Sequence, residues 1–304
     1  MVQLKEIDNA IDELFHYREI GKDPAFSRFI PMVYDPIGFD WRNEFQTEFT
    51  QLFNGLMLRG KEEVNRVFLA VFPSDEVLTR FIEKSSPGDL LFMHHPLVME
   101  CGDPRGKWGS GFIPIPPRYI QQMKKKSLSV YTLHVPLDYS RVISTSDAIA
   151  EALNAKVIGE FYQDEKGACG VICEIEPIST EDLIAVSKEI FSIPYADVHG
   201  NSRSNITKLA IIAGCGDKVD AMKEAEKLGA QAYLTGEVHC HIDNDYGRKK
   251  YDQMKDFIDT TSMSLIGVSH AASEYLVHVT HMKPWFEERF QLPVTLLPQS
   301  KWWI

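Results

Sequence analysis

Short apolar runs alternate with amphipathic segments along this chain, and their spacing predicts an α/β fold. In the first half, the runs Val64–Phe72, Asp89–His95 and Leu128–Val135 are rich in residues that favour buried strands. Amphipathic segments lie between them, and one starts at Ser74, a residue type that caps helix N-termini, directly before an acidic turn. This half therefore predicts strand, helix, strand, helix, strand.

The second half repeats the same order. We expect strands at Lys208–Ala213, Gln231–Thr235 and Met263–Val268, with helices at Lys218–Leu228 and Tyr251–Ile258 between them. Because both halves share this order with little residue identity, the sequence predicts a quasi-repeat of two similar α/β lobes.

The hydropathy pattern also suggests how the chain divides. The predicted parts are an N-terminal lobe, 1–138, a connecting α/β segment, 139–207, and a C-terminal lobe, 208–304. The connecting segment carries no candidate chemistry, and its solitary His199 is expected to be a surface or loop histidine. The Gly- and Pro-rich stretch 101–117 is expected to be a long loop.

Composition narrows the functional classes. The chain is 44% hydrophobic and 25% charged, which is ordinary for a globular protein, and its net charge of −11 argues against nonspecific binding of nucleic acid. The five cysteines include no CxxC pair, which argues against a disulfide framework or a cysteine-rich zinc site. The N-terminus predicts an acidic amphipathic helix rather than a signal peptide, and no apolar run is long enough for a membrane span. We therefore expect a cytoplasmic protein without a membrane partner.

Candidate metal ligands follow two of the strands predicted in the first half. His94 and His95 are adjacent at the end of one strand, where a turning backbone can bring both rings together; the alternative is one buried and one exposed ring. His134 and Asp138 follow the next strand and can line one pocket, although Asp138 can equally cap a loop. Both pairs lie at the carboxyl ends of strands, where open α/β sheets bind ligands.

The second half places similar residues at matching positions. Glu237, His239 and His241 alternate, so an extended segment would direct all three to one face. His270 and Glu274 are four residues apart, which places both on one face of a helix, although such pairs are also common without a ligand. Two later histidines near the C-terminus are expected to be structural.

Taken together, these groups predict more than one metal ion. Imidazole and carboxylate ligands suit Zn, Mn, Fe or Co, and this many ligands exceed a single tetrahedral site. They fit two divalent ions bridged by a carboxylate, an arrangement that generates hydroxide near neutral pH. The expected cofactor is therefore a pair of divalent metal ions, and the expected chemistry is hydrolytic.

Five short motifs resemble those of the NIF-three-like dinuclear metal-centre proteins, also named GTP cyclohydrolase I type 2 homologues. The motifs are Asn54-Gly55-Leu56, His94-His95-Pro96-Leu97, His134 to Asp138, Thr235-Gly236-Glu237, and Ser269-His270 to Ser273-Glu274. The chain departs from the family pattern at Val135-Pro136, where Thr-Asn is usual, and at Ser269, where Gly is usual. The resemblance runs from about Asn54 to the C-terminal helix.

The resemblance implies specific roles. It implies metal ligation by five residues, with Glu274 as the bridging carboxylate: His94, His95, Asp138, His270 and Glu274. It makes His134 a ligand or a near neighbour of one, and His241 falls where many members carry a further histidine. It also implies two similar lobes facing each other across a dinuclear metal cleft, and a homo-oligomer, a hexamer built from dimers or trimers.

The leading functional hypothesis is a metal-dependent hydrolase resembling GTP cyclohydrolase I type 2, acting on a nucleotide or another phosphorylated or heterocyclic small molecule. Glu237 is the candidate catalytic proton carrier, although a role in orienting a metal ligand fits it equally well. The alternative is a non-catalytic metal-binding scaffold, chaperone or regulator. Segment 242–252 and the region before Asn54 are longer than in shorter members, and both can reshape access to a pocket.

Overall fold

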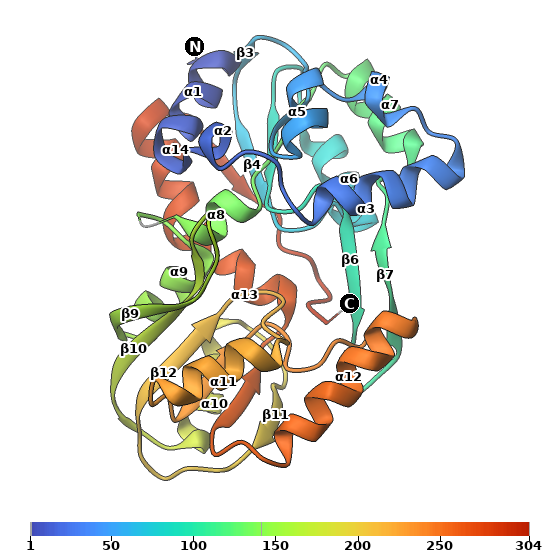
Figure 1. Cartoon of the computed structure of the whole chain (residues 1–304). Helices are drawn as coiled ribbons and strands as arrows, with labels where there is room; N and C mark the ends of the chain where they lie inside the picture. The colour runs from blue at the N-terminus through green and yellow to red at the C-terminus, as the bar shows by residue number, and fades with distance from the viewer. Residues whose placement is uncertain (1, 141, 304) are drawn as a thin grey trace. The chain divides into compact units, whose positions relative to one another are not determined.

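The computed structural model describes residues 2–140 and 142–303, and the chain forms two compact units (Figure 1). Unit 1 comprises Met1–Met99, Phe112–Val142 and His278–Ser300, and unit 2 comprises Glu100–Gly111, Ile143–Val277 and Lys301–Ile304. These bounds differ from the three segments expected from the sequence. Most of the expected connecting segment lies in unit 2, and the chain returns to unit 1 near its end.

Unit 1 is built on a five-stranded sheet with the order β15-β4-β5-β8-β2. Its strands are β2 (Gly55–Leu58), β4 (Val67–Ala70), β5 (Leu90–Met93), β8 (Ser129–Thr132) and β15 (Val294–Leu296). Strands β15, β4, β5 and β8 are parallel, and β2 pairs antiparallel with β8. All residues of β4, β5 and β8 are buried, so the apolar runs of the first half correctly predicted the central strands.

Short helices and one small strand pair surround this sheet. They are β1 (Val2–Gln3), α1 (Leu4–Phe15), α2 (Tyr17–Ile20), α3 (Phe26–Tyr34), η1 (Asp35–Ile37), α4 (Trp41–Glu44), α5 (Thr47–Leu52), β3 (Glu63–Val64), α6 (Asp75–Lys84), α7 (Pro117–Lys125), α8 (Val135–Tyr139), η2 (His278–Met282) and α14 (Lys283–Phe290). The aromatic side chains of α3 to α5 join the same apolar core as the sheet. The predicted cap of α6 is confirmed, because Ser74 Oγ accepts a hydrogen bond from Val77 N.

Unit 2 is built on a six-stranded sheet with the order β11-β14-β13-β12-β10-β9. Its strands are β9 (Lys156–Gln163), β10 (Ala168–Ile178), β11 (Asp197–Gly200), β12 (Ile206–Ile212), β13 (Ala232–Thr235) and β14 (Ser264–Gly267). Strands β12, β13 and β14 are parallel to one another, and β9, β10 and β11 each join the sheet antiparallel to a neighbour. The strands of the expected connecting segment are therefore part of the main sheet of unit 2.

Helices of unit 2 pack in two apolar clusters. The helices are α9 (Thr145–Ala152), α10 (Thr180–Ile190), α11 (Val219–Lys227), α12 (Asp245–Ile258) and α13 (His270–Val277). Along β12, Leu209 and Ile211 belong to the cluster with α9 and α10, whereas Ala210 and Ile212 belong to the cluster with α11 and α12. Since side chains alternate along a strand, the sheet is covered on both faces. Both units thus contain mixed α/β structure, while the predicted repeat stays a prediction.

The stretch expected to be a long loop is instead a two-stranded ribbon, visible in Figure 1. Strands β6 (Val98–Gly102) and β7 (Trp108–Ile113) pair with each other. A Cβ atom at Gly109 would lie 1.9 Å from the carbonyl oxygen of Glu100, so this glycine permits close strand pairing. The loop prediction was wrong because glycine here serves a close approach between backbones rather than an irregular turn.

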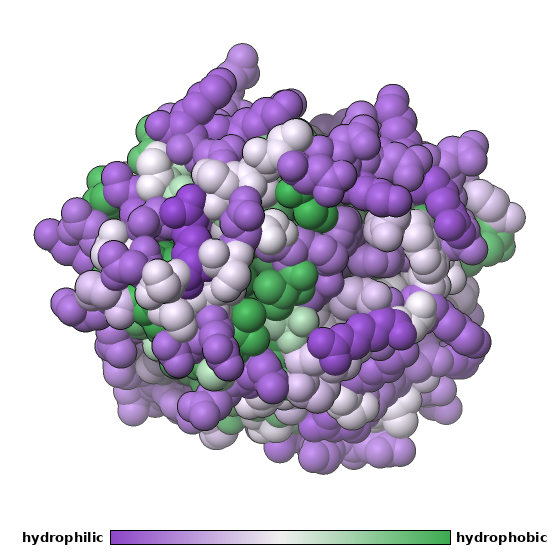
Figure 2. Space-filling model, turned by 90° about the horizontal axis from the view of Figure 1, so that it is seen from below, coloured by the Kyte–Doolittle hydropathy of each residue, from purple (hydrophilic) through white to green (hydrophobic). Residues whose placement is uncertain are grey.

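The described surface matches the charged composition. Figure 2 shows a face that is mainly hydrophilic, with apolar side chains gathered in small patches. Within residues 2–140 and 142–303, no helix is long and apolar enough to cross a bilayer.

Candidate metal centre

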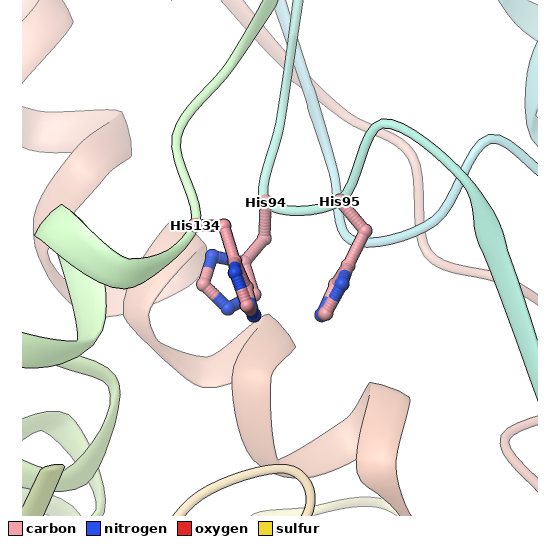
Figure 3. Close-up of side chains that lie close together, drawn as sticks. All are labelled: His94, His95 and His134. Carbon is pink, nitrogen blue, oxygen red and sulfur yellow. The ribbon is translucent and has the colours of Figure 1, made fainter. Parts of the chain in front are cut away.

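Unit 1 brings three histidines together at the ends of two neighbouring strands. His94 and His95 directly follow β5, and His134 follows β8 by one residue after Leu133. Because β5 and β8 are parallel neighbours, their carboxyl ends meet at one edge of the sheet. One nitrogen from each ring lies within 4.8 Å of the others, and Figure 3 shows the three rings extending into the same space. The predicted convergence of His94 and His95 is therefore present, rather than one buried and one exposed ring.

Hydrogen bonds at Nδ1 orient two of these rings. His94 donates from Nδ1 to the carbonyl oxygen of Leu133, at 2.8 Å. His134 donates from Nδ1 to a carboxylate oxygen of Asp23, also at 2.8 Å. A proton on Nδ1 leaves the lone pair of Nε2 for a metal ion, as in carboxylate–histidine–metal arrangements. Both rings are thus held in the tautomer that metal binding requires.

Asp138 adds a carboxylate to the same group. It lies on α8, one helical turn after His134, and its oxygens lie 3.4 Å from His94 Nε2 and 3.8 Å from His134 Nε2. The ring nitrogens opposite the Nδ1 hydrogen bonds therefore point toward a carboxylate. This carboxylate is more exposed than the buried ring of His94, so the group is open to solvent on the side of Asp138.

Buried partners support the three rings. Phe72 packs on His95 with ring centroids 4.4 Å apart, and Phe26 lies 4.7 Å from His134. Asn54 accepts a hydrogen bond from the backbone N–H of His134 at 2.8 Å, which gives the first residue of the Asn-Gly-Leu motif a positioning role. These contacts restrict ring rotation and so preorganise the nitrogens.

Asp23 has an unusual electrostatic environment. Burial by itself would raise the pKa of Asp23, but the charge and hydrogen bond of His134 lower it, as do the backbone N–H groups of Phe26 and Ala25. The net pKa of this carboxyl lies below its ordinary value, so Asp23 stays ionised and keeps accepting the hydrogen bond from His134.

Unit 2 holds a second group, on α13. His270 and Glu274 are one helical turn apart, as the sequence predicted, with His270 Nε2 3.0 Å from Glu274 Oε1. Glu237, in the loop after β13, lies 3.7 Å from His270 Nδ1. All three side chains are buried. A buried histidine between two carboxylates is a strong candidate for a cation site.

Two cysteines border this group. Cys101 Sγ lies 3.6 Å from His270 Nδ1, and Cys215 Sγ donates to Glu237 Oε2 at 3.3 Å. Cys101, Glu237 and His270 each offer a ligand atom within 4.8 Å of the others. Burial is the main cause that raises the pKa of both thiols well above the ordinary value, so they remain protonated in the absence of a metal ion.

Glycines of unit 2 make space for these side chains. A Cβ atom at Gly214 would lie 2.1 Å from Glu274 Oε1, and the residue has a positive φ of 64°. A Cβ atom at Gly236 would lie 2.8 Å from the Cα of His270. Ser273 links the loop at Gly214 to the start of α13. Its Oγ accepts a hydrogen bond from Gly214 N at 2.9 Å and donates one to the carbonyl oxygen of His270 at 2.8 Å. This explains physically why a Ser-Glu pair follows the histidine in the motif.

Ser269 occupies a position where the family pattern has glycine. Its φ is +77°, in the left-handed region that glycine adopts without strain. Its hydroxyl accepts from Ala272 N at 3.3 Å and donates to the carbonyl oxygen of Trp302 at 2.6 Å. The hydroxyl thus caps the start of this helix, and these two hydrogen bonds offset the backbone strain of a residue other than glycine.

The charge of His270 follows from its neighbours. Burial alone would lower the pKa of His270, but the negative charges and hydrogen bonds of Glu274 and Glu237 raise it to about 10. Without a metal ion the ring is therefore a cation that neutralises part of the carboxylate charge. A divalent ion bound here would take over that role and displace the proton.

The segment 237–241 is not extended, so the prediction that its three polar side chains share one face was wrong. Glu237 contacts Cys215 and His270, whereas His239 Nε2 lies 3.1 Å from His199 Nε2. His241 packs on Trp108 and Tyr251, with ring centroids 5.4 and 5.5 Å away. The irregular backbone after Gly236 separates Glu237 from the two histidines, whose ring centroids lie 5.5 Å apart and which both pack on Tyr251.

The expectation of a solitary His199 was also wrong. His199 lies on β11, donates from Nε2 to a carboxylate oxygen of Asp197 at 2.8 Å, and contacts His239. Asp23 and Cys101, which lie beside candidate ligands, were missed as well. No local sequence signal marks them, because each is brought to its histidine from a distant part of the chain.

Sequence relatives carry one recurrent name. An archaeal protein from Archaeoglobus fulgidus, named a GTP cyclohydrolase 1 type 2 homolog, is 29% identical over 187 residues, covering 60% of this chain and 69% of that protein. A protein of the same name from Pyrococcus abyssi is 25% identical over 227 residues, covering 73% of this chain and 80% of its own length.

Solved structures share the fold at low identity. Protein ybgI, described as of unknown function, matches with a TM-score of 0.68 at 17% identity, covering 99% of this chain and 100% of that one. The protein TTHA1606 from Thermus thermophilus matches with a TM-score of 0.64 at 18% identity, covering 99% of each chain. The sequence model of the family Duf34/NIF3 (NGG1p interacting factor 3) matches residues 50–301. Since this match spans most of the chain and all the residues of both groups except Asp23, the protein belongs to the Duf34/NIF3 family.

Proposed function

We propose that this protein is a hydrolase that depends on two divalent metal ions. The observation that carries the proposal is the pair of preorganised ligand groups, one in each unit, in which buried imidazole nitrogens converge with carboxylates. Imidazole and carboxylate ligands suit Zn, Mn, Fe or Co. Bound ions of this class would lower the pKa of water and make hydroxide available near neutral pH.

The proposed ligands are those that the motifs suggested. In unit 1 they are His94, His95 and Asp138, with His134 as a further ligand or a neighbour that orients Asp138. In unit 2 they are His270 and Glu274, and the proposal keeps Glu274 as the bridging carboxylate. That both groups serve one dinuclear cluster is part of the proposal, and magnetic coupling between two bound Mn²⁺ ions, measured by electron paramagnetic resonance, tests it.

Glu237 is proposed to hold and move a proton. Its carboxylate accepts a hydrogen bond from Cys215 and lies beside His270, so it can orient that ring and also receive a proton from it. We propose a small-molecule substrate of the nucleotide or phosphorylated heterocycle class. Support comes from the relatives named GTP cyclohydrolase 1 type 2 homologs, whose identity to this chain is below 30%.

A turnover screen tests the function directly. Metal-free protein and protein loaded with Zn²⁺, Mn²⁺, Fe²⁺ or Co²⁺ would be assayed on GTP, other nucleotides and phosphoesters. We expect hydrolysis that disappears on chelation and in Asp138→Asn but persists in Asp35→Asn, an exposed carboxylate of the same unit. Turnover that survives complete metal removal would contradict the mechanism. Full metal loading with no turnover would favour the non-catalytic scaffold instead.

We also propose a homo-oligomer, with a hexamer as the expected assembly. The support is the family resemblance, and light scattering gives the test. The mass should be a multiple of 34.6 kDa, six-fold for a hexamer. A mass that stays at the single-chain value over a wide concentration range would contradict the proposal.

A further inference from the structure

A third cluster of ligating side chains lies within unit 2, apart from the residues assigned above. Asp197 and His199 come from β11, the edge strand of the six-stranded sheet, and His239 comes from the loop after β13. One atom of each side chain lies within 4.8 Å of the other two. We propose that Asp197, His199 and His239 bind a further divalent metal ion of the zinc class.

The strand geometry creates the cluster. Asp197 and His199 are two residues apart on β11, so both side chains point to the same face of the strand. Asp197 pairs with Gly267 on β14, where a Cβ atom would lie 3.3 Å from the Cβ of Asp197 and 3.3 Å from Val238. Glycine at this position lets the loop that carries His239 approach the edge strand closely.

The distances fit a metal site. His199 Nε2 lies 2.8 Å from Asp197 Oδ1 and 3.1 Å from His239 Nε2. In a tetrahedral zinc site with bonds of roughly 2.0–2.1 Å, two ligand atoms are separated by about 3.3 Å. The two separations are therefore close to the edges of such a tetrahedron, and binding requires only small side-chain shifts.

Hydrogen bonds among these three side chains leave the two ring nitrogens that face each other poorly paired. If His199 Nε2 carries a proton, that proton serves the carboxylate of Asp197, and His239 Nε2 faces an N–H that is already engaged. If His239 Nε2 is protonated as well, two N–H groups oppose each other. A cation that accepts electron pairs from both nitrogens and from the oxygen satisfies all three at once.

The three side chains favour a divalent ion of intermediate softness, and they leave one of its coordination positions open to water. Two imidazoles and one carboxylate suit Zn²⁺ or Co²⁺, and three protein ligands leave a tetrahedral ion one site for water. His239 is buried, whereas the side chains of His199 and Asp197 are 31% and 14% exposed, so an ion can enter from solvent. Tyr251 of α12 packs on His239 at 4.9 Å and holds the ring in place.

The proposed ion would also fix a functional loop. It would connect the loop that carries His239 to the edge strand β11. His239 is two residues after Glu237 of the unit 2 group. The role is structural with respect to that group, because the ion would restrict the backbone that positions Glu237. Metal binding by this cluster does not require the proposed hydrolase activity, so it can be tested without a substrate.

Zinc counting tests the proposal. Metal-free full-length protein would be titrated with Zn²⁺, and bound zinc would be measured by elemental analysis after gel filtration. His199→Gln and Asp197→Asn should each lose one ion per chain relative to the wild type. His16→Asn, which removes an exposed histidine and tolerates the left-handed backbone there, should keep every ion. Loss of a direct ligand should weaken binding by more than the roughly 10–100-fold expected for an outer partner.

A variant that lacks ligands in the other two groups separates zinc bound at this cluster from zinc bound elsewhere. The double variant Asp138→Asn/Glu274→Gln should retain the proposed ion, and adding His199→Gln should remove it. Crystals soaked in Zn²⁺ should show an anomalous peak among Asp197, His199 and His239. Equal zinc content and affinity in wild type and His199→Gln, or no anomalous peak at this position, would overturn the proposal. Circular dichroism of each variant confirms that a lost ion does not reflect a lost fold.

Discussion

The two ligand groups differ in how they compensate charge. In unit 1, His94 and His134 donate from Nδ1 to a carbonyl oxygen and to Asp23, and their Nε2 atoms face Asp138. In unit 2, His270 lies between two buried carboxylates, which raise its pKa to about 10 although burial opposes this. The unit 1 group is therefore preorganised to accept an ion directly, whereas the unit 2 group must release a proton when it binds one.

The comparison also shows two ways to build a site. Unit 1 uses the carboxyl ends of parallel strands, which bring residues distant in sequence to one edge. Unit 2 uses one turn of a helix and glycines that leave space for the carboxylate. The first group should therefore be sensitive to the partners that orient its rings, and the second should be sensitive to added volume.

The largest expected effect comes from Glu274. Glu274→Gln keeps the size of the side chain and removes the charge that offsets repulsion between two ions, so we expect loss of at least one ion per chain. His278→Gln, one helical turn later, should keep all ions. Metal analysis with circular dichroism checks both variants. Wild-type metal content and affinity in Glu274→Gln would show that Glu274 is not the bridge.

Gly214 tests the sensitivity of unit 2 to volume. In Gly214→Ala the new methyl group would collide with Glu274, which should cost about 1–3 kcal/mol of overpacking in addition to about 1–2 kcal/mol for the positive φ. Gly38→Ala is the matched control, because Gly38 has a φ of +66° and a Cβ atom there would meet nothing within 4 Å. Urea unfolding should separate the two variants. Equal destabilisation would mean that Glu274 moves aside freely.

Asp23 tests the orienting hydrogen bond of unit 1. Asp23→Asn keeps an acceptor for the backbone N–H groups but removes the charge opposite His134, so metal affinity should fall by roughly 10–100-fold. Asp164→Asn is the control, because Asp164 also accepts backbone N–H groups within its own turn. Calorimetric titration with Zn²⁺ measures both. Unchanged affinity in Asp23→Asn would mean that His134 is not a ligand.

The smallest expected effect concerns pH. Because the pKa of His270 is raised from 6.5 to about 10 in the folded protein, its charge stabilises the metal-free fold fully below about pH 6.5. That contribution is lost as the pH rises through 10. The difference in urea midpoint between metal-free wild type and His270→Gln should therefore shrink between about pH 6 and pH 10.5. A constant difference would show that His270 is not charged in the metal-free protein.

The sequence by itself predicted much of the local structure. The apolar runs located the central strands of both sheets, and the i, i+4 spacing placed His270 and Glu274 on one helix face. These features depend on periodicity and on short-range geometry, which a sequence carries directly. The motifs were enough to identify the family because their residues keep a fixed order along the chain.

Only the tertiary structure decided which distant residues meet. Asp23 reaches His134 across 111 positions, and Cys101 reaches His270 across 169. The irregular backbone after Gly236 separates Glu237 from His239, and pairing of β11 with β14 places His199 beside His239. Such contacts depend on sheet order and on close backbone approach, which arise from packing of the whole unit rather than from the pattern of any one segment.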